Sequence, residues 1–207
     1  MKTNKFLLIL MGMMFAFYAC SDDSVSVIDV NDDDNGNDDQ EEVELDPALM
    51  GAWVLDPTEG SLAVGPSAED LSWWAISEAD VEGRACLYDD LYIFNEDGTF
   101  ENELGGETWL ETWQGVEEDR CGEPVPPHDG SNVGQWSTSG STVTIEGEGN
   151  YLGLSKVHNG GEDGNPANDR IEYTYELSEG DEVLEIRISG WNPDVANATW
   201  YYRFIRQ

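Results

Sequence analysis

The most constraining feature of this chain is residues 171–188, IEYTYELSEGDEVLEIRI. Apolar and polar residues alternate on both sides of a polar turn at Ser178–Asp181. Because successive side chains of a strand point to opposite faces, this spacing predicts a β-hairpin with one apolar face. That face would carry Ile171, Tyr173, Tyr175 and Leu177 from the first strand and Leu184, Ile186 and Ile188 from the second.

The same alternation recurs along the chain. Residues 51–55 form a short apolar run, 91–104 a hairpin with its turn at 95–98, and 134–147 a hairpin turning at Ser139–Gly140. Residues 199–205, TWYYRFI, give a last strand. Since a long apolar stripe of period 3.6 is missing, we predict an all-β chain of eight to ten strands. Hairpin connections favour an antiparallel up-and-down β-barrel, with a β-sandwich as the alternative.

The N-terminus is typical of an export signal. Lys2 and Lys5 flank an apolar run over residues 6–19, which is shorter than the roughly 20 residues of a membrane span. The following Cys20 resembles the acylated cysteine of a bacterial lipobox, and residues 21–23 resemble the acidic export tag of Bacteroidetes surface lipoproteins. The resemblance implies a signal peptide over residues 1–19 and a lipid anchor on Cys20. It further implies an outer-membrane location facing the cell exterior. An ordinary signal peptide cleaved nearby is the alternative.

Residues 20–46 carry only acidic charges and no aromatic side chain, which predicts a disordered tether. Within them, Asn31 to Glu42 imitates the spacing of a calcium loop. The loop starts with Asn rather than Asp and has no flanking helices, so we favour the tether. The remaining residues, 47–207, are enough for a single domain.

Charge excludes one class of partner. The chain has 9 Lys and Arg against 44 Asp and Glu, and its net charge is −35. Nucleic acid binding needs clustered basic residues, so we predict none, and we exclude an anionic glycan held mainly by charge. No cofactor is predicted, although the acidic loop at residues 159–169 leaves calcium binding open.

Cys86 and Cys121 are the only cysteines besides Cys20. In an exported protein such a pair predicts a disulfide. Zinc is disfavoured, because His128 and His158 do not supply the usual ligand spacing.

Three long insertions interrupt the strand pattern, at about residues 57–90, 105–133 and 153–170. Loops of this length are uncommon and usually functional. The Cys86–Cys121 bond would tie the first insertion to the second at one rim of the barrel. Adjacent Trp73 and Trp74 would point to opposite faces, one seating the loop and one meeting a ligand. Four tryptophans lie in the insertions, Trp73, Trp74, Trp109 and Trp113, whereas Trp53, Trp136 and Trp200 lie in strand patterns and are predicted to be core.

Residues 107–114, ETWLETWQ, repeat the tripeptide E-T-W. As a strand, Glu107, Trp109, Glu111 and Trp113 would share a face; as a helix, both tryptophans would join Leu110 in an apolar stripe. Indoles beside carboxylates are typical of sites for neutral sugars, while packing of the rings is the alternative. On a strand the two carboxylates would be about 13 Å apart, too far for a glycosidase pair. Since no hydrolytic motif is present, we predict a protein without enzymatic activity.

Two resemblances sharpen this interpretation. The order of G-x-W at 51–53, FNEDGTF at 94–100 and G-x-W at 134–136 with TVTI at 142–145 is similar to lipocalin-like domains of bacterial lipoproteins. Longer strings, among them LAVGPSAEDLSWWAIS and CGEPVPPHDGS, resemble a non-catalytic module of marine Bacteroidetes polysaccharide-utilisation systems, found beside family 16 glycoside hydrolases. This second resemblance covers nearly all of residues 50–207 and implies binding of β-glucan, such as laminarin, at the cell surface.

The hypothesis from the sequence is a surface lipoprotein that captures a neutral β-glucan. Trp73 or Trp74 would form a stacking platform with Trp109 and Trp113. Its expected partners are the glucan, an outer-membrane importer complex and, through the acyl chain, the membrane itself. A structural module that binds no glycan is the alternative, and a glycoside hydrolase is a less favoured third. The residues expected to bind sugar hydroxyls are Glu107, Glu111, His128 and Asp129.

Overall fold

The structure is a computed structural model that describes residues 43–157, 168–192 and 194–207. The predictions for the signal peptide, Cys20, the tether up to Glu42, His158 and most of the acidic loop at 159–169 lie outside these residues. None of the described helices has the length and apolar character needed to cross a bilayer.

The described residues form strands joined by short helices. The strands are β1 (Gly51–Leu55), β2 (Leu62–Gly65), β3 (Trp74–Ala75), β4 (Leu91–Phe94), β5 (Thr99–Glu103), β6 (Thr108–Leu110), β7 (Arg120–Gly122), β8 (Gly134–Ser139), β9 (Thr142–Glu146), β10 (Arg170–Ser178), β11 (Val183–Ser189) and β12 (Thr199–Arg206). The helices are α1 (Glu78–Gly83) and the 3₁₀ turns η1 (Pro47–Leu49), η2 (Ala85–Leu87), η3 (Thr112–Gln114) and η4 (Ser155–Val157).

Eight antiparallel strands close into a barrel in the order β1-β4-β5-β8-β9-β10-β11-β12, and β12 pairs back with β1 through Phe204 and Leu55. The predicted all-β barrel is thereby confirmed, and the sandwich alternative is excluded because closure removes the sheet edges that a sandwich keeps. Beyond the end of β1, β12 also pairs with β2, and β3 adds to β2.

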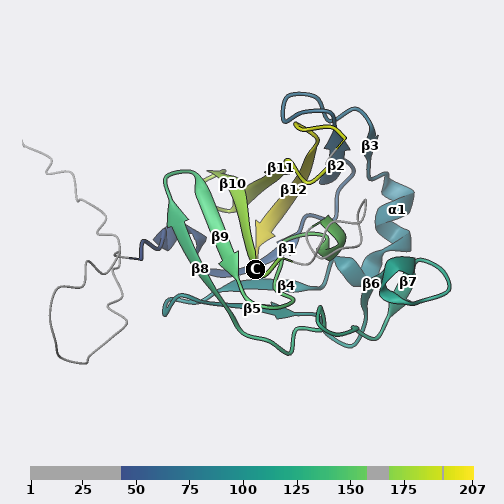
Figure 1. Cartoon of the computed structure of the whole chain (residues 1–207), viewed down its shortest axis with the longest axis horizontal. Coiled ribbons are helices and arrows are strands. Elements are labelled where there is room, and N and C mark those ends of the chain that lie inside the picture. The colour runs from purple at the N-terminus through teal and green to yellow at the C-terminus, as the bar shows by residue number, and fades with distance from the viewer. Residues whose placement is uncertain (1–42, 158–167, 193) are drawn as a thin grey trace, which may run out of the picture.

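Connections of an antiparallel barrel alternate between its two ends. We call one the turn end, made by residues 95–98, 140–141 and 179–182. The other is the loop end, made by residues 56–90, 104–133 and 147–157. In Figure 1 the loop end lies at the right, where α1, β3, β6 and β7 gather, and the described N-terminal segment enters at the left.

Aromatic side chains fill the axis of the barrel. Phe94 contacts Phe100 and Trp136 edge to face, with ring centroids 5.1 Å apart in each pair. Trp53, Trp136 and Trp200 are 0%, 2% and 5% exposed, as their strand patterns predicted. The interior is therefore a packed core. Its largest fully buried side chains are Trp53, Trp136, Tyr92, Tyr173, Tyr202, Phe94, Phe100 and Phe204.

A segment that leads into the third insertion closes the loop end. We call residues 150–154 the plug; its buried side chains include Tyr151, Leu152 and Leu154. The Asn102 amide of β5 donates to the Tyr151 carbonyl at 3.0 Å. Gly153 has a φ of +77°, and a Cβ there would lie 2.3 Å from the Tyr202 ring. Only glycine fits that position, so the plug can enter the barrel mouth.

The turn end is closed by the N-terminal segment. Leu49 of η1 is fully buried, and its carbonyl accepts a hydrogen bond from Trp53 Nε1 at 2.8 Å. The Arg206 guanidinium lies 4.3 Å from the Trp53 ring centroid and donates to the carbonyls of Ala48 and Met50 at 2.7 and 2.8 Å. Apolar packing and satisfied hydrogen bonds therefore seal this end.

Two local features differ from the sequence prediction. The turn between β8 and β9 lies at Gly140–Ser141, one residue later than predicted. α1 occupies a stretch that had the character of a polar loop. A capping box starts it: Asp80 N–H donates to Ser77 Oγ, and Ser77 N–H donates to Asp80 Oδ2, both at 3.2 Å. A six-residue helix is too short to show an apolar period.

Candidate functional site

The tryptophan doublet divides as the parity of an extended chain requires. Trp74, in β3, is partly buried and contacts Trp200 edge to face at a centroid distance of 6.2 Å. Trp73 is 48% exposed and makes no ring contact with any described residue. Trp74 therefore seats the first insertion on the barrel, and Trp73 is the outward indole.

The predicted disulfide between Cys86 and Cys121 is confirmed. It joins η2 of the first insertion to β7 of the second, at the loop end. Cys121 pairs with Trp109 across the small β6–β7 ribbon. Arg84, just before η2, places its guanidinium carbon 4.5 Å from the Trp109 ring centroid and 5.5 Å from that of Trp74. The structure thus brings Trp74 and Trp109, two residues of the predicted platform, into contact with the same cation, and the sequence analysis did not predict that cation.

The E-T-W repeat adopts neither of the two predicted conformations over its whole length. Residues 108–110 form β6, and the chain then turns into η3. As a result, Glu107 is exposed whereas Glu111 is 8% exposed. The two carboxylates do not share one face of a strand, because the strand ends between them.

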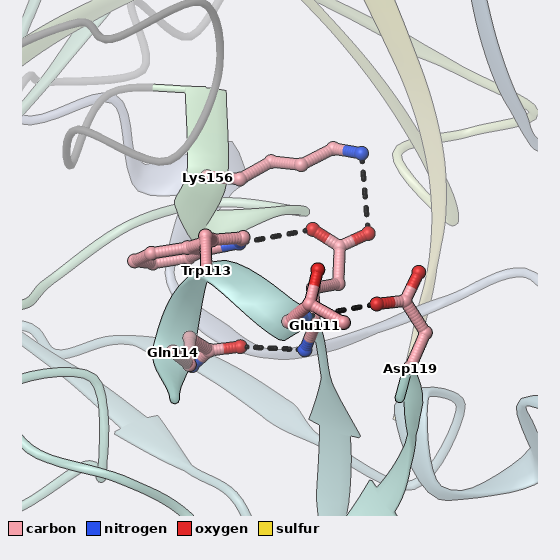
Figure 2. Close-up of polar contacts among 6 residues, drawn as sticks. Glu111, Trp113, Gln114, Asp119 and Lys156 are labelled. Carbon is pink, nitrogen blue, oxygen red and sulfur yellow. Dashed lines mark hydrogen bonds and ion pairs between the residues drawn. The ribbon is translucent and has the colours of Figure 1, made fainter. Parts of the chain in front are cut away.

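Glu111 joins two insertions (Figure 2). Its Oε2 accepts from the Trp113 indole Nε1 at 3.1 Å, and its Oε1 lies 3.1 Å from Lys156 Nζ of η4. The backbone N–H of Glu111 donates to Gln114 Oε1 at 3.0 Å. Lys156 also lies 5.3 Å from the Trp200 ring centroid. The buried carboxylate therefore orients the Trp113 ring and anchors the segment that follows the plug.

His128 is packed beside this cluster. It is 4% exposed, and its ring lies 5.5 Å from the Trp113 ring and 5.9 Å from the Tyr151 ring of the plug. Asp129 turns away: its Oδ1 accepts from the Ser131 hydroxyl at 2.6 Å and from the Ser131 N–H at 3.0 Å. These two bonds, the hydroxyl bond first, lower the pKa of Asp129. Of the predicted hydroxyl-binding residues, Glu111 and His128 both contact Trp113, whereas the Asp129 carboxylate is bonded within its own turn.

Asp90 is a buried acid at the same end. It is fully buried, its Oδ2 accepts from the Thr108 hydroxyl at 2.6 Å, and its Oδ1 has no partner among the described residues. Burial raises the pKa of Asp90 to about 8. Thr108, Glu111 and Tyr151 line a cavity of about 10 Å³, the lower limit for one water molecule. A sugar ring does not fit this space.

The turn end holds a wider, open depression of about 690 Å³. Its wall includes Glu96, Asp97 and Glu101, and its one aromatic residue, Phe94, is 1% exposed. It offers carboxylates but no aromatic face on which a sugar can stack. The exposed and half-exposed indoles lie at the loop end instead.

The sequence analysis missed three residues of the loop end, namely Arg84, Lys156 and the buried Asp90. A signal for the two cations existed, since basic residues are scarce in this acidic chain and these two lie inside predicted insertions. Asp90 ends the run YDD before a strand and carried no such signal. Among the described residues, no group of three or more His, Cys, Asp or Glu side chains is arranged to hold a metal ion.

Neither protein-family models nor curated proteins gave a match to this chain.

Proposed function

We propose that this protein is a cell-surface glycan-binding lipoprotein that captures a neutral, laminarin-like β-glucan for a polysaccharide-utilisation system. The glucan would bind on the outer surface of the loop end, because the barrel interior is occupied by its own aromatic core. An acylated Cys20 and the tether would hold the barrel near an outer-membrane importer complex.

The observation that carries this proposal is the distribution of tryptophans. All four tryptophans of the insertions, Trp73, Trp74, Trp109 and Trp113, keep exposed indole surface. The strand tryptophans Trp53 and Trp136 keep almost none. Indole faces pack on the C–H groups of pyranose rings, so a surface that keeps them beside polar groups favours a sugar ligand.

The charge of the chain favours a neutral glycan. A net charge of −35 repels uronates and sulfated sugars and leaves the binding of hydroxyl groups unaffected. A hydroxyl both donates and accepts hydrogen bonds, so carboxylates, backbone groups and guanidinium groups can all bind it.

A second candidate is a structural module that binds no glycan. It is favoured by the engagement of three of the four indoles with protein groups, Trp74 and Trp109 with Arg84 and Trp113 with Glu111. In that case the tryptophans would hold the insertions in place, and Trp73 would be the one of the four without such a contact among the described residues.

Affinity electrophoresis and calorimetry against laminarin distinguish these functions. We expect retardation of the wild type and a loss of affinity of about 10-fold in both Trp73→Ala and Trp113→Ala, since an aromatic contact is worth about 1 kcal/mol beyond its buried area. The control is Val133→Ala, because Val133 is 60% exposed and carries no ring. A folded wild type that no neutral glucan retards would exclude glycan capture and leave the structural module.

A further inference from the structure

We infer that Arg84 is a hydrogen-bond donor of the glycan site, held in contact with two indoles so that its N–H groups bind a pair of neighbouring hydroxyls on a neutral sugar. This inference rests on the proposed function and adds a specificity-determining residue to it. Arg84 would supply the directional contact, while the exposed indoles supply ring stacking.

Contacts with its neighbours hold Arg84 in place. The Arg84 guanidinium carbon lies 4.5 Å from the Trp109 ring centroid and 5.5 Å from that of Trp74. Its backbone N–H closes α1 by donating to the Asp80 carbonyl at 2.9 Å. Two residues later, Cys86 is bonded to Cys121, the cross-strand neighbour of Trp109. The backbone and the side chain are therefore both fixed.

The Arg84 guanidinium has no hydrogen-bond acceptor and no ion-pair partner among the described residues. Four of the other basic residues in the described chain form ion pairs with carboxylates, namely Lys156, Arg170, Arg187 and Arg203. A fifth, Arg206, donates to backbone carbonyls. Arg84 donates to no acceptor among the described residues, although the chain carries 44 acids. Its side chain is partly exposed, so its donors reach solvent.

A guanidinium beside an aromatic ring keeps hydrogen-bond donors available. Ring contacts use the flat faces of the guanidinium and leave its edge N–H groups free in the plane. Such a fork donates two parallel hydrogen bonds, and it loses little freedom on binding because the rings already hold it. Two neighbouring hydroxyl oxygens of a pyranose are acceptors that a fork of this kind can bind together.

Neutral hydroxyls are favoured over a carboxylate as the acceptor. The surrounding chain has a net charge of −35, and a single cation does not reverse the repulsion that an anionic glycan meets. Binding through hydroxyls therefore predicts an affinity that changes little with ionic strength, whereas binding of an anion would weaken as salt screens the contact.

The test compares Arg84→Ala and Arg84→Lys with Arg120→Ala by calorimetry against a laminarin oligosaccharide, with thermal unfolding of each variant measured in parallel. Arg120 is the matched control: it is exposed, precedes Cys121 in β7, and has no ring or carboxylate partner among the described residues. We expect Arg84→Ala to bind about 10- to 100-fold more weakly, the value of two lost hydrogen bonds. Arg84→Lys should lose about 5-fold or more, because an ammonium keeps the charge and lacks the fork.

Arg120→Ala should match the wild type, and wild-type affinity should change less than about 2-fold between 50 and 500 mM NaCl. Equal affinity of the wild type and Arg84→Lys, or of the wild type and a folded Arg84→Ala, would reduce Arg84 to a clamp between two rings and leave the proposed function intact. A wild type that binds an acidic glycan more tightly, with affinity lost in salt, would overturn the assignment to hydroxyls. Absence of any glucan binding by the wild type would overturn the proposed function itself, and the inference with it.

Discussion

The two ends of the barrel are closed in different ways. At the turn end, Trp53 is fully buried, its indole N–H donates to Leu49, and Arg206 covers its ring while bonding to two carbonyls of the same segment. At the loop end, Trp113 and Trp109 keep exposed surface. Both ends use tryptophan and a cation, but only the loop end leaves indole surface and donors available.

The two ends also differ in how completely their buried polar atoms are hydrogen-bonded. Asp90 Oδ1, Trp109 Nε1 and Trp200 Nε1 are buried at the loop end without a partner among the described residues. Such atoms cost stability and are retained where function or an ordered water requires them. The turn end is therefore the more completely satisfied of the two, and the loop end is the one that the proposed glycan site would use.

The sharpest test of this division uses two tryptophans. Trp53→Ala should cost about 3 to 5 kcal/mol of unfolding free energy, because it removes a fully buried ring from the core. Trp73→Ala should cost about 1 kcal/mol or less, since Trp73 is 48% exposed. Urea denaturation measures both. Equal losses would show that Trp73 also supports the fold and would break the comparison.

The disulfide is expected to stabilise by about 3 to 4 kcal/mol, from a separation of 35 residues in the chain-entropy treatment. The double variant Cys86→Ala/Cys121→Ala should lose this amount in urea denaturation. Its glucan affinity should fall as well, because the bond holds Arg84 and Trp109 in register. As a control, both proteins are also measured in reductant, which should destabilise the wild type and leave the double variant unchanged. Retained affinity in the double variant would show that packing alone positions these residues.

The two E-T-W tripeptides provide a matched pair within the loop end. Glu111→Gln should cost about 1 to 3 kcal/mol, because it removes the carboxylate that pairs with Lys156 while keeping an acceptor for Trp113. Glu107→Gln should stay within about 0.5 kcal/mol of the wild type, because Glu107 is exposed.

A double-mutant cycle with Lys156→Met isolates the Glu111–Lys156 coupling, which we expect to be about 0.5 to 3 kcal/mol. The indole N–H resonance of Trp113 should shift in Glu111→Gln and stay in place in Glu107→Gln. If both glutamine variants behave alike, the contacts of Glu111 with Trp113 and Lys156 in Figure 2 do not contribute measurably to stability.

Most of the barrel was predictable because its strands alternate at a period of two. Residues 171–177 and 183–188 specify their own pairing through a short turn, which is local information. The plug was not predictable: Tyr151, Leu152 and Leu154 lie at the edge of a predicted insertion, and their burial depends on a barrel mouth built by distant strands. The local alternation of apolar and polar residues carries no information about a contact between segments that are distant in the sequence.

The candidate site was predictable in composition and not in geometry. The parity of Trp73 and Trp74 gave one inward and one outward ring, but which ring faces in depends on Trp200, more than a hundred residues away. Likewise, Arg84 reaches Trp109 because the disulfide brings two insertions together. A spacing of E-T-W could not reveal that the strand ends at Leu110 and buries only the second glutamate.

A last comparison of the two ends uses pH. The pKa of Asp90 is raised from 3.8 to about 8 by burial, so the folded state retains a proton that the unfolded chain releases. Stability should therefore fall as pH rises between about 4 and 8, by at most about 1.4 kcal/mol per pH unit from this group. Asp90→Asn stays neutral throughout and should flatten that slope.

Asp97 at the turn end has the opposite sign. Hydrogen bonds from Thr99, its hydroxyl first and then its N–H, lower the pKa of Asp97 below 3.8. Its contribution is present above the unfolded pKa and is lost as pH falls through the lower folded value. Asp97→Asn should thus lose a constant amount of stability above about pH 4, and this loss should shrink to nothing as the pH falls into the acid range. Asp90→Asn should instead change the slope between about pH 4 and 8. The difference between each variant and the wild type is the quantity to compare, because it removes the contributions of all other titrating groups. Parallel stability curves for wild type and Asp90→Asn from pH 4 to 8 would mean that water reaches Asp90, and that the loop end is less tightly closed than its buried acid implies.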